Sequence, residues 1–341
     1  MMDQSHFMRL EDANANRTEN HIVEISWEPP TIRPGISVHA GLSAEDPIRW
    51  ISPDQVEQGR VTLAGLEAPV RYYYRLNDGN GARLLVAERR VMMEGTVNFR
   101  DIGGYRTTDG QRVKWGRVFR ADGLSRLTVR DHEIFTHMGI SRVVDFRTHA
   151  EVRHAPNLLP ENADIDYVHL PVVHGEFDFV SAMERIKKGD TDWLTPDFML
   201  KGYIGNLEKF AGVWGRVIDG LADPGKMPVV FHCTGGKDRT GTCAALILLM
   251  LGVPEETVIA DHQLSNVYIA RLLPRISELM ASYGVDPDVV NPYLTAPKEC
   301  IRAVLDYIRD QYGSVDVYLA EKAGVSGFRQ EEIRRHLLEA S

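Results

Sequence analysis

The chain has 341 residues, with 48 acidic and 39 basic side chains and a formal net charge of −9. This length is enough for two domains with real cores, and the negative charge argues against a general nucleic-acid-binding protein. Three widely spaced cysteines give no disulfide framework, and no stretch reaches the roughly 18 consecutive apolar residues of a membrane span. Because the polar N-terminus also lacks the apolar core of a secretory signal, we expect a cytoplasmic protein without integral membrane association. Secretion by a route that uses no signal stays open.

The first quarter of the chain has the pattern of short strands. Residues 1–20 are polar, and we expect them to be disordered. From residue 21 apolar side chains alternate with polar ones, as at Val23, Ile25 and Trp27. This pattern predicts a small all-β sandwich at residues 21–93 that resembles fibronectin type III or immunoglobulin-like modules. We expect such a module to be able to bind a protein partner.

After about residue 94 the pattern changes to alternating strands and helices. The expected elements are, in chain order, a helix from Thr128 to Met138, strands at 141–146 and 166–173, a long helix at 196–221, a strand that ends at His232, and mostly helical chain from residue 254. This order predicts an α/β domain over residues 94–341, with a central sheet flanked by helices. Open sheets of this kind bind ligands at the carboxyl ends of their strands.

The segment from Val229 to Gly241 carries the most specific signal. An apolar run delivers Cys233, five residues form a loop, and Arg239 opens a new apolar segment with helical spacing. A loop between a strand and a helix N-terminus turns its backbone N–H groups toward a common centre, which suits a tetrahedral anion. Gly235 and Gly236 allow the backbone conformations that such a cradle requires.

The side chains of this loop indicate phosphate chemistry. Arg239 can grip two phosphate oxygens through its planar guanidinium, and the same positive field favours the thiolate form of Cys233. The candidate phosphate-binding residues are Thr234, Gly235, Gly236, Lys237, Asp238 and Arg239.

Other interpretations of the loop are weaker. A nucleotide-binding P-loop needs Ser or Thr after its Gly-Lys, and here Lys237 is followed by Asp238. His232, Cys233 and Cys243 do not have the spacing of a zinc site, and a structural cysteine would not need three charged residues beside it. We therefore expect no metal and no cofactor.

Further blocks of sequence extend the signal beyond the loop. They are Asn98–Tyr105, Val118–Asp122, Val144–Glu151 and Tyr312–Leu319. Together with His232–Gly241, these blocks resemble the bacterial protein-tyrosine/serine phosphatases of the IphP type, in the same order and over roughly residues 94–338. One departure is Gly235, where members of that family usually carry Ala. Removal of one methyl group should be tolerated.

The resemblance implies metal-free, cysteine-dependent hydrolysis of phosphomonoesters. Cys233 would attack phosphorus to form a phosphocysteine intermediate, while Arg239 and the loop N–H groups stabilise the charge on the oxygens. Thr240 would donate a hydrogen bond to the departing sulfur. His232 would orient the backbone of Cys233, although a buried histidine without any role explains it equally well.

The general acid is open between several aspartates. Asp238, inside the loop, is the preferred candidate, and its alternative role is to position Arg239 or Lys237. Asp145 is the main rival, at the end of a strand that we expect to neighbour the active one. Its alternative role is structural, in a salt-bridge cluster with Arg147 and Glu151.

Asp101 is a third candidate. The block Asn98–Tyr105 that contains it can instead be a turn that holds the sheet edge. Lys237 as a second loop cation favours substrates with several phosphates, such as phosphoinositides, or it only strengthens the loop field. In one member of the family, a helical pair in the region that corresponds to residues 261–293 acts as a lid over the active site. Core packing explains the apolar stripe in this region equally well.

Three functions compete on this basis. The first is a phosphatase of phosphotyrosine that extends to phosphoserine, phosphothreonine and phosphoinositides. The second is a phosphatase of phosphoinositides or small molecules with incidental activity on proteins. The third is a phospho-binding adaptor, in which the β-sandwich recruits partners. The presence of Cys233, Arg239 and Thr240 argues against the adaptor, since a binding protein does not need the nucleophile.

Overall fold

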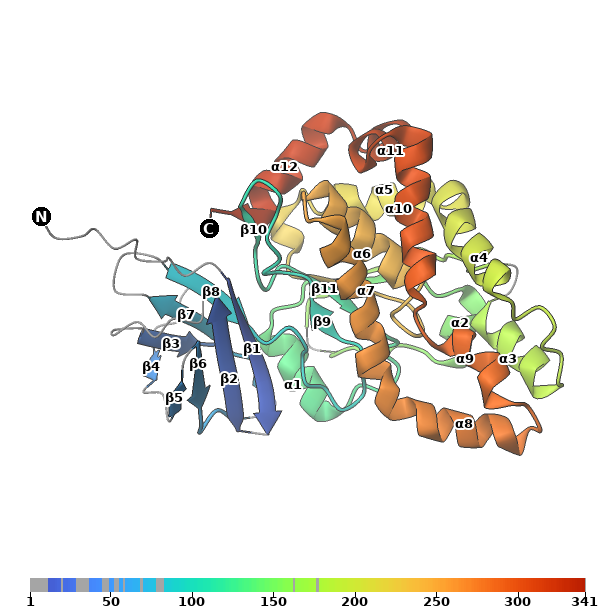
Figure 1. Cartoon of the computed structure of the whole chain (residues 1–341), viewed down its shortest axis with the longest axis horizontal. Coiled ribbons are helices and arrows are strands. Elements are labelled where there is room, and N and C mark those ends of the chain that lie inside the picture. Colours follow the sequence, from blue (N-terminus) through green and yellow to red (C-terminus); the bar gives the residue numbers. More distant parts are fainter. Residues whose placement is uncertain are drawn as a thin grey trace, which may run out of the picture.

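A computed structural model of the chain describes residues 12–19, 21–28, 37–44, 49–51, 55–57, 59–67, 70–77, 83–161, 163–175 and 178–340. An all-β part and a larger part of helices around a sheet lie side by side (Figure 1). The expectation that residues 1–20 are disordered is wrong for Asp12–Glu19, which form strand β1. Small apolar residues explain this strand, since Ala13 and Ala15 alternate with polar residues and face the core. Residues 1–11 and 20 lie outside the described ranges.

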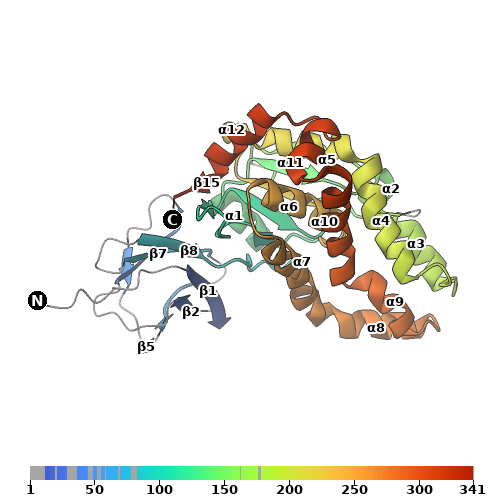
Figure 2. The same cartoon turned by 45° about the horizontal axis from the view of Figure 1, so that its top comes forward.

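Two antiparallel sheets make up the N-terminal β part, which we define as residues 12–88. One sheet has the order β1-β2-β6-β5, with β2 at Ile22–Glu28, β6 at Arg60–Leu63 and β5 at Gln55–Glu57. The other has the order β4-β3-β7-β8, with β4 at Arg49–Ile51, β3 at Ser37–Gly41, β7 at Tyr73–Asn77 and β8 at Arg83–Ala87. Figure 2 separates the sheet of β7 and β8 from that of β1 and β2. Side chains from both sheets share one buried cluster, which also takes in Trp115 from the next part of the chain. The likeness to fibronectin or immunoglobulin modules stays a prediction.

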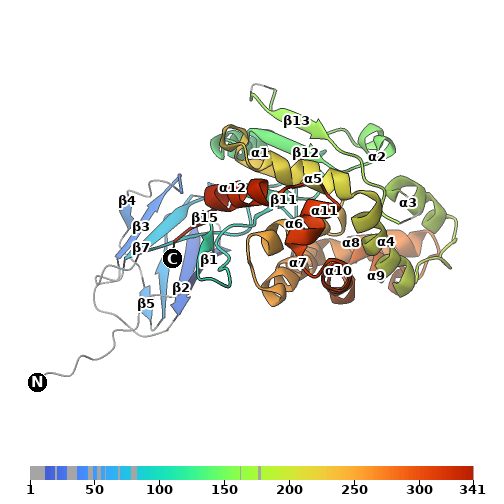
Figure 3. The same ribbon diagram turned by 90° about the horizontal axis from the view of Figure 1, so that it is seen from above.

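A five-stranded mixed sheet lies at the centre of the C-terminal part. Its order is β13-β12-β14-β11-β9, with β13 at Asp166–His169, β12 at Arg142–Asp145, β14 at Val229–His232, β11 at Val118–Ala121 and β9 at Arg100–Asp101. The first four strands are parallel, and β9 is antiparallel to β11. Figure 3 shows β13, β12 and β11 in this sequence across the molecule. The register aligns Ala121, Asp145 and His232, so three strands end at one edge of the sheet.

Helices flank this sheet as the sequence predicts. They are α1 (Val129–His137), α2 (His149–His154), α3 (Phe179–Lys187), α4 (Pro196–Lys209), α5 (Ala211–Gly220), η1 (Pro224–Lys226), α6 (Arg239–Met250), α7 (Glu255–Ile269), η2 (Ala270–Leu272), α8 (Leu273–Ser282), α9 (Pro287–Leu294), α10 (Lys298–Tyr312), α11 (Val315–Glu321) and α12 (Gly327–Leu337), and a short pair joins β10 (Arg112–Val113) to β15 (Leu338–Glu339). Thr128 caps α1, as expected. The single long helix expected over residues 196–221 is instead two helices that meet at Phe210. Within the described ranges, none of these helices is both long and apolar enough to cross a membrane.

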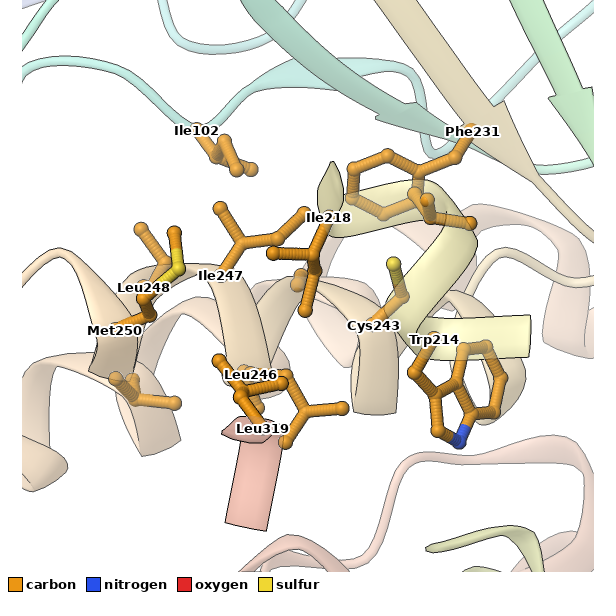
Figure 4. Close-up of a cluster of buried hydrophobic side chains, with 14 of the residues drawn as sticks. Ile102, Trp214, Ile218, Phe231, Cys243, Leu246, Ile247, Leu248, Met250 and Leu319 are labelled. Carbon is orange, nitrogen blue, oxygen red and sulfur yellow. The ribbon is translucent and has the colours of Figure 1, made fainter. Parts of the chain in front are cut away.

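Alternation along the central strand β14 divides the core between the two faces of the sheet. Val230 joins a cluster with Phe135 of α1, while Phe231 joins a larger cluster with Trp214 of α5 and with α6. Figure 4 shows Phe231 and Trp214 around the helix that carries Cys243 and Leu246. Helix α6 is buried on nearly all sides, which explains its continuous apolar sequence. This packing fixes the start of α6, and with it Arg239, directly after the loop.

Candidate active site

A cavity of about 360 Å³ lies beyond the carboxyl ends of β11, β12 and β14. The thiol of Cys233 belongs to a residue that is only 2% exposed, and the loop that follows lines the cavity up to Arg239 at the start of α6. The strand, loop and helix therefore have the arrangement that the sequence predicts. The other wall comes from α7, α8 and α9, through Ile269, Ile276, Tyr293 and neighbouring residues.

Donors from neighbouring segments bind three carbonyl groups of the loop. Asn98 donates from its amide to the carbonyl oxygens of Gly235 and Gly236, at 3.1 Å each. Arg120 donates to Gly236 at 2.9 Å, and the N–H of Gly123 donates to the carbonyl of Thr234 at 3.0 Å. When the carbonyls of a loop point outward, its N–H groups are free to point inward, which is the arrangement that binds anions. Asn98 therefore supports the loop from the segment that precedes β9.

The two loop glycines have different reasons to be glycine. Gly236 has a φ of +67°, and a Cβ atom there would lie 2.6 Å from the backbone of Ala121. Gly235 has no such conformation, and the nearest atom to a Cβ built there is Cγ of Lys237, at 3.7 Å. The expectation that both glycines are needed for unusual backbone angles is therefore wrong for Gly235, where Ala also fits.

Arg239 is fixed by a carboxylate and two backbone carbonyls. Its guanidinium donates to both oxygens of Glu151 at 2.7 Å, and to the carbonyls of Phe146 and Val172. Burial would lower the pKa of Arg239, but the hydrogen bonds and charge of Glu151 outweigh it and raise the pKa. Glu151 also accepts hydrogen bonds from the hydroxyl of Thr234 and from the N–H of Thr148, where it completes a capping box. The salt-bridge cluster considered as the alternative role of Asp145 is therefore wrong for Glu151, which pairs with Arg239, but confirmed for Arg147, which pairs with Asp145.

Asp145 lies behind the loop rather than in the cavity. It is fully buried and accepts hydrogen bonds from Arg147, Asn157 and Tyr167. Burial would raise its pKa, but the electrostatic interaction with His232 and the bonds from Arg147 hold the pKa of Asp145 far below its usual value. This placement fits the structural role considered for Asp145 better than that of general acid. Arg147 itself reaches the cavity lining.

His232 connects Asp145 to the cysteine. Its Nε2 lies 3.5 Å from Asp145, and its Nδ1 lies 3.3 Å from the carbonyl oxygen of Cys233. Burial lowers the pKa of His232 to about 4, so the ring is neutral at neutral pH. These contacts fit the expected role of His232 in orienting the backbone of Cys233.

Asp238 lies in the cavity lining and accepts three hydrogen bonds from two donor groups. Lys237 Nζ lies 2.9 and 2.7 Å from its two oxygens, and the hydroxyl of Tyr203 donates to it at 2.7 Å. Burial would raise the pKa of Asp238, but Lys237, His174 and Tyr203 together lower it to about 2. Lys237 is thus bound to Asp238 in the free protein.

Behind Tyr203 the hydrogen bonds run in one direction. His262 Nε2 lies 2.9 Å from the hydroxyl of Tyr203, and the amide nitrogen of Gln263 lies 3.3 Å from His262 Nδ1. An amide NH₂ only donates, so Nδ1 accepts, and the neutral ring carries its proton on Nε2. His262 therefore donates to Tyr203, and Tyr203 donates to Asp238.

Asp101 does not reach the cavity. Its carboxylate accepts from Arg71 of the β part and from the N–H groups of Gly103 and Gly116, all at 2.7 Å. The idea that Asp101 contributes to the pocket is therefore wrong, and its block holds the sheet edge at β9, as the alternative has it. Thr240 is fully buried, and its hydroxyl has no hydrogen-bond partner among the described residues.

Several supporting residues were not candidates from the sequence. Asp261 accepts from Arg100 and from Arg120 and so neutralises the two arginines that hold Asn98 and the loop. Asp122 lines the cavity and accepts hydrogen bonds from the N–H groups of Val97 and Asn98. These bonds fix the backbone of Asn98, whose side chain supports the loop. Arg120 and Asp122 lie inside the family-like block Val118–Asp122, so this block could have identified them as site residues. Tyr203, His262 and Asp261 lie outside those blocks.

The region predicted as a lid contributes to the cavity. Ile276 of α8 and Tyr293 of α9 line it, while Met280 packs with Ile186 of α3 in a separate small core. Ile276 and Tyr293 therefore have the place expected of a cover over the site, and Met280 has the place expected of core packing. Movement of a lid stays a prediction. In the part of the chain that the structure describes, no three His, Cys, Asp or Glu side chains gather so that they could hold a metal ion.

This fold and site define an α/β protein in which a loop that starts at a buried cysteine joins a central strand to a buried helix. The chain belongs to the tyrosine phosphatase family, because the sequence model of that family matches residues 91–339. The resemblance drawn from the sequence blocks and the expectation of a phosphatase are thereby confirmed.

Three relatives give the extent of the similarity. A Cupriavidus necator protein that is named as a tyrosine-protein phosphatase is 33% identical over 245 residues, which cover 71% of this chain and 85% of that protein. The triple specificity protein phosphatase PtpB of Mycobacterium tuberculosis is 28% identical over 277 residues, with 72% of this chain and 98% of PtpB covered. A tyrosine-protein phosphatase of Nostoc commune is 28% identical over 230 residues, with 65% of this chain and 74% of that protein covered.

The two loop glycines allow a matched test. We expect Gly236→Ala to lower kcat by about a hundredfold or more, because the added methyl group would displace the loop from β11. Gly235→Ala should keep kcat within about threefold of the wild type, because the site has space for the methyl group. Steady-state kinetics on both proteins, with circular dichroism to confirm folding, make the measurement. Equal losses in the two variants would contradict this account of the loop.

Three buried histidines near the loop predict acid sensitivity of the fold. Burial lowers the pKa of His174 and His232 to about 4 and that of His262 to about 3, from an ordinary value of 6.5. Below pH 6.5 these histidines bind protons in the unfolded chain but stay neutral in the folded protein, which favours unfolding. The free energy of unfolding is therefore highest above pH 6.5 and falls as the pH drops toward 4. We expect a loss of about 1.4 kcal/mol per pH unit for each histidine within this window.

Urea denaturation at several pH values measures this slope. In His262→Gln the slope between about pH 5 and 6.5 should be smaller than in the wild type, because one of the three buried rings is removed. A free energy of unfolding that is constant over this pH range would rule out the assignment of neutral, buried rings.

Proposed function

We propose that this protein hydrolyses phosphomonoesters through a phosphocysteine intermediate, with phosphotyrosine as its main substrate. The observation that carries this proposal is the loop itself, in which Cys233 and Arg239 line one cavity and Asn98 binds two of the loop carbonyls. Membership of the tyrosine phosphatase family supports it. We assign catalysis to residues 94–341 and keep a partner-binding role for residues 21–93 as a prediction.

Two steps make up the proposed reaction. In the first, the sulfur of Cys233 bonds to phosphorus, the bond from phosphorus to the ester oxygen breaks, and Asp238 gives that oxygen its proton. In the second, Asp238 takes a proton from water, the water oxygen bonds to phosphorus, and the sulfur leaves as a thiolate. Arg239 and the loop N–H groups bind the phosphoryl oxygens in both steps, and Thr240 donates to the departing sulfur.

The role of Asp238 requires a change of its charge state on binding. With a pKa of about 2 it is a carboxylate in the free protein, held so mainly by Lys237. A phosphate dianion beside Asp238 disfavours its carboxylate form and draws Lys237 toward the phosphate oxygens. Both effects raise the pKa of Asp238, so that it can hold the proton that the leaving group needs.

The cavity wall favours an aromatic ester. Apolar side chains of the helical wall face the loop, and they are Ile269, Leu272, Ile276, Tyr293 and Leu294. Such a wall packs against the ring of phosphotyrosine better than against the short chain of phosphoserine. Activity on phosphoserine, phosphothreonine and phosphoinositides remains part of the proposal, and Lys237 is the residue that would favour additional phosphates.

A substrate panel with an inactivated variant tests the proposal. Phosphotyrosine peptide, phosphoserine peptide and phosphoinositide are each assayed with a metal chelator present, on the wild type and on Cys233→Ser. We expect phosphotyrosine to be hydrolysed fastest and Cys233→Ser to lose at least about a thousandfold in kcat. Fast phosphoinositide turnover with negligible peptide turnover would select the second function. Tight phosphopeptide binding without any turnover would select the adaptor.

The chain from His262 through Tyr203 to Asp238 gives a sharper test of the acid. Tyr203→Phe removes a donor that favours the carboxylate, so the pKa of Asp238 rises. Activity that requires protonated Asp238 declines as pH rises through that pKa, so the basic limb of the kcat profile should move to higher pH. We expect a shift of about half to one pH unit, the size of one hydrogen bond.

Tyr318→Phe is the matched control for this experiment. Tyr318 is as deeply buried as Tyr203, and its hydroxyl donates at 2.8 Å to the carbonyl of Leu207, on the same helix α4 as Tyr203. Its loss should affect stability but leave the pH profile unmoved. If both variants have the wild-type profile, Asp238 is not the acid that Tyr203 controls.

A further inference from the structure

Several arginines near the loop after Cys233 are neutralised by buried carboxylates. Arg100 and Arg120 pair with Asp261, and Arg147 pairs with Asp145. These ion pairs compensate charge that the fold has taken out of water. An arginine beside the cavity that lacks such a partner has instead a charge that a bound substrate can neutralise.

Three arginines beside the active cavity have no carboxylate partner, and we call Arg90, Arg126 and Arg271 the rim arginines. Arg126 is exposed and belongs to the cavity lining. Arg271 is exposed in η2, where α7 leads into α8 (Figure 1), and Arg90 is half-buried after β8. In the part of the chain that the structure describes, no carboxylate lies within ion-pair distance of any of the three.

Arg126 and Arg271 lie against the same short segment of chain. The guanidinium of Arg271 donates to the carbonyl of Thr96 at 3.3 Å. Gly95 packs so closely on Arg126 that a Cβ atom built on Gly95 would lie 2.0 Å from the carbonyl oxygen of Arg126. The segment continues into Val97, which lines the cavity. Both arginines therefore lie next to the point where this segment joins the cavity wall.

Arg90 places a second positive charge beside Arg271. The Cζ atom of Arg90 lies 5.2 Å from the centre of the Tyr268 ring. Burial and then the like charge of Arg271 lower the pKa of Arg90. The carboxylate of Asp122 acts on Arg90 and Arg126 only from a distance, since it takes its hydrogen bonds from backbone N–H groups. A bound anion would relieve the repulsion between the two neighbouring arginines.

An apolar wall accompanies these charges and indicates the order of groups in the substrate. Ile269 and Leu272, on either side of Arg271 in sequence, line the cavity together with Ile276 and Tyr293. A matching substrate has a phosphate in the loop, an apolar ring on the wall and a second anionic group at the rim. Phosphotyrosine with an acidic neighbour in a peptide has this order. A phosphoinositide carries its phosphates on one polar ring, with no apolar body between them.

We propose that the rim arginines bind an acidic side chain beside the phosphotyrosine, so that the protein prefers acidic phosphopeptides. This inference rests on the proposed function, because it names the substrate class of the same site. The planar guanidinium of arginine suits a carboxylate, with two parallel hydrogen bonds. Each exposed ion pair contributes little, so the preference comes from the three arginines together.

Two phosphotyrosine peptides test the proposal, one with glutamate on both sides of the phosphotyrosine and one with glutamine. We expect kcat/KM of the full-length wild type to be about fivefold higher for the glutamate peptide. This ratio should fall as the NaCl concentration rises, because salt screens exposed charges. Arg271→Gln and Arg126→Gln should each lower the ratio to about half its wild-type value or less. Damage to the loop would instead slow both peptides alike and leave the ratio unchanged.

Arg216→Gln is the matched control. It removes an exposed arginine of α5 that lies outside the cavity lining, and it should keep the wild-type ratio. A wild-type ratio near one, or a ratio that both rim variants leave unchanged, would overturn the inference. If the rim variants instead slow only a phosphoinositide with several phosphates, the rim binds a second phosphate and the assignment of an acidic side chain is wrong.

Binding of the same peptides to Cys233→Ser, followed by fluorescence anisotropy, separates this inference from the proposed reaction. Tighter binding of the glutamate peptide, lost in Cys233→Ser that also carries Arg271→Gln, supports the rim site even if the wild type hydrolyses neither peptide. That result without turnover would count against the phosphatase proposal alone. Equal affinity for the two peptides, or binding of neither, would overturn the rim site.

Discussion

The active site depends on the direction of the carbonyl groups in the loop from Thr234 to Asp238. A loop that points its N–H groups at an anion must turn its carbonyls into the protein, where each needs a donor because water is excluded. Asn98 supplies both hydrogens of one amide to two neighbouring carbonyls, and Arg120 supplies a further donor. The conformation of Gly236 brings the loop close enough to β11 for these bonds. The loop conformation that we propose for phosphate binding is therefore already present in the free protein.

Buried donors of this kind require buried acceptors with the opposite charge. Arg100 and Arg120 are fully buried, and an uncompensated charge there would cost several kcal/mol. Asp261 binds both of them, so one carboxylate on α7 stabilises two arginines that hold the loop and its support. Glu151 does the same for Arg239 from α2. The positive field that remains for the substrate comes from the loop N–H groups and from the part of Arg239 that lines the cavity.

What the sequence predicts well is local along the chain. The loop lies within about ten residues between an apolar strand and an apolar helix, so Cys233 and Arg239 could be located from the pattern alone. The alternative cluster of Asp145, Arg147 and Glu151 is local along the chain, yet the side chain of Glu151 caps α2 and meets Arg239, 88 residues away. Contacts of this separation depend on how the strands are ordered in the sheet, and no short pattern encodes that order.

The β part has a structural reason to be where it is. Strand β9 is the edge of the central sheet, and an open edge leaves unpaired backbone groups. The chain that leaves β8 pairs with this edge, through the N–H of Val91 to Phe99 and the N–H of Asp101 to Arg89. Arg71 then neutralises Asp101, which is fully buried at the same edge. Asn98, which holds the loop, lies just before the edge strand β9 in the chain. The residues that cover the sheet edge and the residue that supports the loop are therefore neighbours in sequence. The segment from Asn98 to Asp101 therefore contacts both the β part, through Arg71, and the loop after Cys233, through Asn98.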